Sequence, residues 1–62
     1  MPIVRIELLP GRSGRQKAEA AERITQLITE VLECSPESVD VIYVEIQPLD
    51  WAHAGKMYSA PK

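Results

Sequence analysis

The order of patterns along the chain limits the fold more than any other feature. An almost continuously apolar run from Pro2 to about Leu9 predicts a first strand, and Pro10-Gly11 predicts a turn. The β-branched run from Val39 to about Gln47 predicts a second strand, which Pro48 ends. About thirty residues separate the strand starts, which suits a right-handed crossover between parallel strands. We therefore expect an α+β fold with one βαβ unit, in which residues 1–62 form a single domain.

A long amphipathic helix is expected between the strands. Ser13, followed three residues later by Gln16, fits a capping box at its start. Apolar residues then recur at helical spacing on one face, at Ala20, Ile24, Leu27, Ile28, Val31 and Leu32. The helix should end near Cys34, because Pro36 disfavours helical geometry in the residue before it. A short helical turn with Pro36 as its first residue is the expected continuation.

Such a chain is too small to cover its sheet and bury a stable core on its own. Two strands and one helix leave two bare sheet edges and one uncovered sheet face. A chain of 62 residues buries only about 60% of its unfolded surface. Cys34 is the single cysteine, so no disulfide within the chain adds stability. We therefore expect a homo-oligomer in which neighbouring subunits cover these surfaces.

Composition argues against several classes of function. Seven basic and nine acidic residues give a net charge of −2, and no basic patch with interleaved aromatics predicts nucleic-acid binding. His53 and Cys34 are the only residues of their types, so no metal site is expected. No signal peptide and no membrane-spanning apolar run are recognisable in the sequence. The prediction is a cytoplasmic homo-oligomer that binds neither nucleic acid nor membrane.

Pro2 is the first candidate for catalysis. An initiator methionine before a small residue is a good aminopeptidase substrate, and removal of Met1 would leave Pro2 with a free secondary amine. An α-amino group has a pKa near ~8, which burial among apolar neighbours lowers. A neutral amine can then act as a general base. A Met-Pro start is common, however, and a retained Met1 would make the Pro2 nitrogen a tertiary amide, which is not basic.

Several short motifs together resemble the 4-oxalocrotonate tautomerase family. They are the opening Met1–Val4, the turn Gly11–Ser13, the capped helix, the strand entry at Ser38-Val39, and Trp51. The similarity runs with little or no gap from Pro2 to about Trp51. It implies a tautomerase/MIF-like oligomer, a homohexamer built as a trimer of dimers. It also implies proton transfer between enol and keto forms of small 2-oxo acids, with Pro2 as base or acid and no cofactor.

The resemblance gives Arg12 and Trp51 roles in substrate binding. Arg12 matches the family arginine that binds a substrate carboxylate, and a guanidinium fork suits a planar carboxylate. Its alternative is a solvated turn residue. Trp51 falls where the family has an active-site aromatic, an apolar wall that excludes water and helps to keep Pro2 neutral. An anchor at a subunit interface is the alternative for Trp51.

Asp40 departs from the family, because the best-known members have a second arginine there. An anion at this position would repel a dicarboxylate and raise the pKa of a nearby amine. We therefore expect a substrate with one carboxylate rather than a 2-hydroxymuconate-type diacid. Asp40 could instead pair with Arg12 of a neighbouring subunit, or remain a solvated residue at the strand entry.

Two other functions follow from this departure. In the first, Asp40 orients a water molecule, as acidic residues do in hydratase and dehalogenase members of the superfamily. In the second, the chain is a non-catalytic scaffold subunit of a homo- or hetero-oligomer.

The C-terminal segment departs as well. The family usually has a Gly-rich hairpin after the aromatic, and only Gly55 is retained here. A short hairpin or a tail is therefore expected, with Met57–Lys62 as a tail whose order depends on docking.

Overall fold

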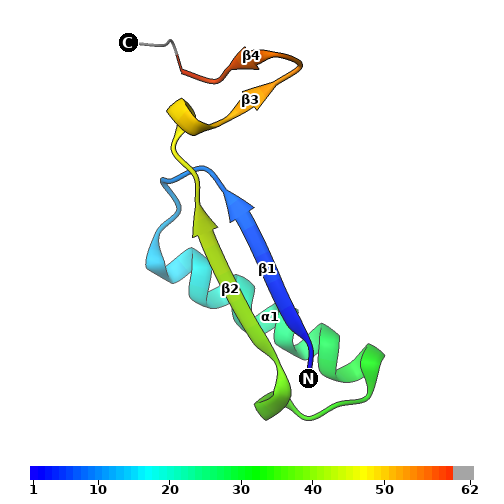
Figure 1. The fold of residues 1–62 in the computed structure, drawn as a ribbon. Coiled ribbons are helices and arrows are strands. Elements are labelled where there is room, and N and C mark those ends of the chain that lie inside the picture. The colour runs from blue at the N-terminus through cyan, green and yellow to red at the C-terminus, as the bar shows by residue number, and fades with distance from the viewer. Residues whose placement is uncertain (60–62) are drawn as a thin grey trace.

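The computed structural model describes residues 1–59 and has the predicted strand–helix–strand order (Figure 1). β1 (Ile3–Leu8) and β2 (Asp40–Glu45) form a parallel two-stranded sheet. The helix α1 (Gly14–Leu32) covers one face of this sheet. Beyond the carboxyl ends of both strands, β3 (Ala52–His53) and β4 (Lys56–Met57) form an antiparallel hairpin. The predicted α+β class and βαβ unit are confirmed.

The register of the parallel strands places their first residues side by side. Ile3 lies opposite Asp40, and Leu8 lies opposite Glu45. The Asp40 N–H also donates to the Pro2 carbonyl at 3.0 Å, which extends the ladder by one residue. Residues just before or at the two strand starts are therefore neighbours in space, although more than thirty positions separate them in the chain.

The start of α1 has the predicted capping box. The Gln16 N–H donates to the Ser13 hydroxyl at 3.1 Å, and the Ser13 N–H donates to the Gln16 side-chain oxygen at 3.0 Å. The helix ends at Leu32, where Glu33 caps it in a left-handed conformation with φ 54°. The short helical turn that the sequence predicts is also present, as a 3₁₀ turn over Pro36–Ser38.

A polar cluster holds the first half of α1 against β2. The Tyr43 hydroxyl donates to the backbone carbonyl of Lys17 at 2.8 Å. The Lys17 ammonium is 2.6 Å from a carboxylate oxygen of Glu45 and 5.8 Å from the centre of the Tyr43 ring. Because Tyr43 and Glu45 project from the same face of β2, they fix where α1 crosses the sheet.

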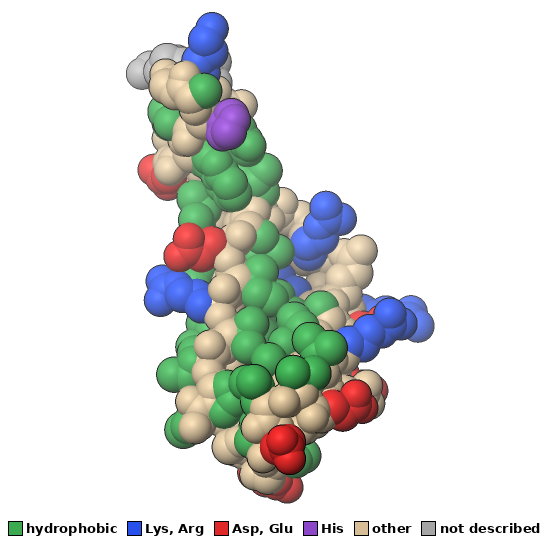
Figure 2. All heavy atoms as spheres, turned by 90° about the vertical axis from the view of Figure 1, so that its right-hand side faces the viewer, with side chains coloured by type: hydrophobic (Ala, Val, Ile, Leu, Met, Phe, Trp, Pro, Cys, Tyr) green, Lys and Arg blue, Asp and Glu red, His purple; other side chains and the backbone are tan. Residues whose placement is uncertain are grey.

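The described residues form no buried core. None of the described residues 1–59 is fully buried, and the radius of gyration is 15.1 Å, against about 11 Å for a compact chain of this length. The sheet face away from α1 carries Ile3 and Ile42, which are 62% and 44% exposed. On α1, Leu27 and Val31 are 59% and 67% exposed. Figure 2 shows hydrophobic side chains along much of the length of one side of the molecule.

Two sequence expectations need correction. The second strand ends at Glu45 rather than near Gln47, because the chain leaves the sheet to enter a 3₁₀ turn over Pro48–Asp50.

The prediction of a tail from Met57 is wrong for residues 57 and 58. Met57 is in β4, and the Tyr58 N–H donates to the Trp51 carbonyl. Ala54 and Gly55 turn the hairpin with φ of 53° and 81°, both positive as a tight two-residue hairpin turn requires. Ser59 follows outside any strand, and the last residues of that predicted tail, 60–62, lie outside the described residues.

No helix in the described part of the chain is long and apolar enough to cross a membrane. The cytoplasmic location stays a prediction.

Candidate active site

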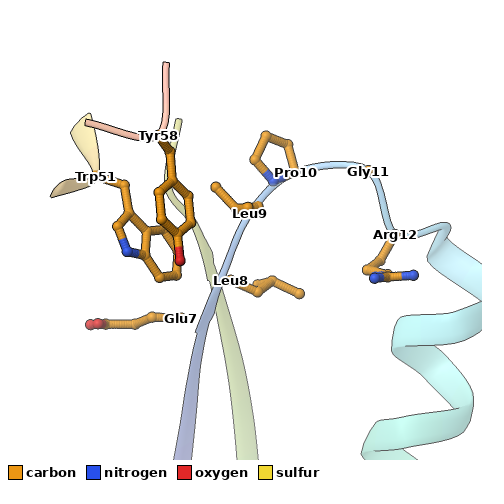
Figure 3. Close-up of a pocket in the computed structure, with 8 residues that line it drawn as sticks. All are labelled: Glu7, Leu8, Leu9, Pro10, Gly11, Arg12, Trp51 and Tyr58. Atoms are coloured by element: carbon orange, nitrogen blue, oxygen red, sulfur yellow. The ribbon is translucent and has the colours of Figure 1, made fainter. Parts of the chain in front are cut away.

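A pocket of about 620 Å³ lies at the carboxyl end of β1, between the turn into α1 and the C-terminal hairpin (Figure 3). Its lining residues are Glu7, Leu8, Leu9, Pro10, Gly11, Arg12, Trp51 and Tyr58. Backbone and apolar side chains form much of the wall, and two ionisable side chains of opposite sign, those of Arg12 and Glu7, contribute charge. The pocket therefore joins an arginine to aromatic side chains, and two of the four sequence candidates, Arg12 and Trp51, line it.

The turn before α1 positions Arg12. Gly11 has φ 123°, a conformation that residues with a side chain rarely adopt, and this allows the chain to turn from β1 toward the helix. Arg12 then directly precedes the helix cap Ser13. Among the described residues, no ion pair involves Arg12, and its side chain is exposed. Its guanidinium is thus available for an anionic ligand, which it can hold through two parallel hydrogen bonds.

The aromatic wall has two members rather than one. The rings of Trp51 and Tyr58 stack with their centres 5.1 Å apart and their planes 7° apart. The Tyr58 N–H also donates to the Trp51 carbonyl at 2.9 Å. In Figure 3 the Tyr58 ring lies between Trp51 and the side of the pocket formed by Leu9 and Pro10. Sequence reasoning missed Tyr58 because it assigned this residue to the tail.

Pro2 and Asp40 lie at the opposite end of the sheet from the pocket. Pro2 is half-buried just before β1, and its carbonyl is bonded to the Asp40 N–H. Met1 precedes Pro2 in this structure, so the Pro2 nitrogen is in amide form here. β1 has six residues, which at about 3.3 Å each separates its two ends by roughly 20 Å. Within one chain, Pro2 therefore lies near Asp40, and Arg12 lies near Trp51. The two pairs are at opposite ends of the sheet.

No group of three or more His, Cys, Asp or Glu residues within residues 1–59 is placed to hold a metal ion.

The fold and the pocket define a class of protein: a small βαβ chain with no buried core among residues 1–59, whose pocket combines an arginine with an aromatic wall. The chain belongs to the tautomerase family, because residues 2–60 match the family model described as Tautomerase enzyme. A probable tautomerase of Halalkalibacterium halodurans is 37% identical over 59 residues, which cover 95% of this chain and 97% of that protein.

Solved structures agree with this assignment. The crystal structure of YwhB, described as a homologue of 4-oxalocrotonate tautomerase, has a TM-score of 0.90 at 31% identity and covers 98% of this chain and 100% of that chain. A 4-oxalocrotonate tautomerase from Chloroflexus aurantiacus, described as a heterohexamer, has a TM-score of 0.86 at 31% identity and covers 94% of each chain. The resemblance seen in the sequence is therefore confirmed.

Proposed function

We propose that the protein is a cofactor-free keto–enol tautomerase for a small 2-oxo acid, with the Pro2 amine as general base and acid once Met1 is removed. Membership in a family of tautomerase enzymes supports the reaction class. The observation that carries the assignment of residues is the pocket that joins the exposed guanidinium of Arg12 to an aromatic wall. Such a pocket suits a planar, conjugated carboxylate.

The proposed reaction needs no group beyond the amine and the substrate. The neutral Pro2 nitrogen takes the proton of the enol hydroxyl. The oxygen then forms the carbonyl, and the electron pair of the carbon–carbon double bond moves to the neighbouring carbon. Pro2 returns the proton to this carbon, which gives the keto acid. A positioned base of this kind contributes about 10²–10⁴-fold. Arg12 holds the carboxylate, while the aromatic wall excludes water from the amine.

We further propose that each complete site combines two subunits of a homo-oligomer. Pro2 and Arg12 lie at opposite ends of β1, roughly 20 Å apart, so a single chain cannot present both to one small substrate. Association of subunits would also cover the apolar surfaces that the isolated chain exposes at Ile3, Ile42, Leu27 and Val31. A hexamer, built as a trimer of dimers, is the assembly that the family resemblance favours.

Ultraviolet absorbance during ketonisation tests the catalytic proposal. Correctly processed wild type and Pro2→Ala, with the N-terminus of each verified by mass spectrometry, are compared on phenylenolpyruvate and 2-hydroxymuconate. We expect wild type to accelerate decay of the enol and Pro2→Ala to lose about 10²–10⁴-fold. If both proteins match the buffer rate on both enols, the hydratase and the non-catalytic scaffold functions replace this proposal.

Mixed oligomers test whether the site is shared. Pro2→Ala and Arg12→Ala proteins, each expected to be weakly active, are unfolded together, refolded as a mixture and assayed. Random mixing would give about a quarter of the sites an intact Pro2 from one subunit and an intact Arg12 from another. Activity that returns to about this fraction of wild type supports the shared site. A mixture no more active than its two components refutes it.

A hydratase is the second candidate, favoured by the position of Asp40. Its N–H is bonded to the Pro2 carbonyl, so its carboxylate belongs to the same end of the sheet as the proposed base. There it could orient a water molecule for addition to an unsaturated acid. Asp40→Asn separates the two functions, because a hydratase should lose activity, whereas a tautomerase hindered by the anion should keep or improve its rate, above all on the diacid.

A further inference from the structure

We infer that Tyr58 determines substrate specificity, and that the pocket selects an acid with one carboxylate and a flat aromatic or similarly conjugated substituent. This inference rests on the proposed function, since it names the substrate class for the same site. Three features of the pocket carry it: the free face of Tyr58, the rigidity of the stacked pair, and the charges at its two sides.

The stacked pair forms a flat apolar surface inside the pocket. Trp51 supports one face of the Tyr58 ring at a centre-to-centre distance of 5.1 Å and a plane angle of 7°. The opposite face of Tyr58 looks toward Leu9 and Pro10 across the pocket (Figure 3). A planar substituent can therefore stack on Tyr58 while its other face contacts the apolar side chain of Leu9.

The backbone keeps this surface in place. The Tyr58 N–H bonds to the Trp51 carbonyl at 2.9 Å, directly beyond the paired residues of β3 and β4. Tyr58 is nevertheless 53% exposed, so its ring is accessible to a ligand. Because the surface is already assembled, a flat ligand gains stacking energy without the entropy cost of ordering the hairpin.

The two charged side chains of the pocket have opposite effects on a carboxylate: Arg12 attracts it and Glu7 repels it. Arg12 provides a cation that is free of ion pairs among the described residues. Glu7 lies beside the aromatic pair in Figure 3 and brings a negative charge, which Arg5 offsets in part through its contact at 3.3 Å. A second carboxylate held against the rings would meet Glu7, whereas an uncharged ring would not.

Equilibrium binding tests the inference without any catalytic step. Cinnamate carries one carboxylate and an aromatic ring, while cis,cis-muconate carries two carboxylates on a conjugated chain. Their dissociation constants are measured calorimetrically for the assembled protein as wild type, Tyr58→Phe and Tyr58→Leu. Met57→Leu is the matched control, because Met57 belongs to the same hairpin but does not line the pocket. Sedimentation velocity confirms that each variant has the wild-type assembly.

We expect wild type to prefer cinnamate, and Tyr58→Phe and Met57→Leu to keep that preference. Tyr58→Leu retains apolar bulk without a flat ring, and should weaken cinnamate binding about tenfold with little effect on muconate. Equal changes for both ligands, or no change for either, would overturn the inference. Since binding requires no proton transfer, a protein that binds as expected but fails to ketonise enols would refute the proposed function alone.

Discussion

Substitution of Ile42 by Asp tests the proposal that association supplies the missing core. Ile42 lies on the sheet face that α1 leaves uncovered and is 44% exposed in the isolated subunit. If that face packs against another subunit, a carboxylate there loses water without gaining a partner. If the face remained in water, the same substitution would change the free energy of unfolding by no more than about 0.5 kcal/mol.

The structure gives a scale for the effect. The subunit exposes 5035 Å², whereas an average monomeric protein of 6.9 kDa exposes about 4,000 Å². The excess, about 1,000 Å², is of the size that each partner buries in a standard interface, about 800 Å². Burial of the exposed part of Ile42 on association contributes about 1 kcal/mol, which the substitution removes. An unpaired carboxylate buried in the interface costs several kcal/mol more. We expect association to weaken at least about 100-fold, which corresponds to about 3 kcal/mol.

Sedimentation velocity and thermal unfolding across a concentration series provide the measurement. Wild type should remain assembled, with an unfolding temperature that rises with protein concentration, because folding and association are linked. Ile42→Asp should dissociate and unfold at a lower temperature. Gln26→Glu adds one negative charge at an exposed position of α1 and should leave both readings unchanged. An Ile42→Asp protein that assembles and melts like wild type would refute the reasoning.

Three further substitutions test local structure. Gly11→Ala should strain the turn by about 1–3 kcal/mol through its positive φ alone, since nothing lies within 4 Å of an added methyl group. Its activity should show a raised KM, because Arg12 moves. Ser13→Ala removes the helix cap and should lower the free energy of unfolding by about 1 kcal/mol in urea titrations, with an unchanged KM. Tyr43→Phe loses the hydrogen bond to the Lys17 carbonyl and should cost about 0.5–1.5 kcal/mol in the same titrations; a larger loss would show that the ring has shifted.

Most of the fold could be predicted from local patterns. The capping box is formed within four successive residues, from Ser13 to Gln16, so the local sequence marked the helix start to within a residue. The end of the second strand was harder to predict, because Ile46 continues the β-branched run before it. β2 ends at Glu45, opposite the last residue of β1, before the chain leaves the sheet for the 3₁₀ turn over Pro48–Asp50.

The candidate site was harder to predict for a geometric reason. Arg12 and Trp51 were named and do line one pocket, but a list of residues carries no distances. The parallel strands separate these two from Pro2 and Asp40 by the length of β1. Tyr58 was missed because two-residue strands are too short to show alternation. With the turn placed at Ala54-Gly55, the pairs 53–56 and 52–57 would have predicted that residue 58 meets Trp51.

The stacked aromatic pair also makes the pocket visible to spectroscopy. Trp51 is the single tryptophan of the chain, so excitation at wavelengths that tyrosine does not absorb reports on this one place in each subunit. Because Trp51 stacks on Tyr58, we expect its emission to change when a ligand contacts Tyr58 or when the hairpin opens. The pocket thus carries an intrinsic fluorescent probe, with which ligand binding can be followed in real time on the unlabelled protein.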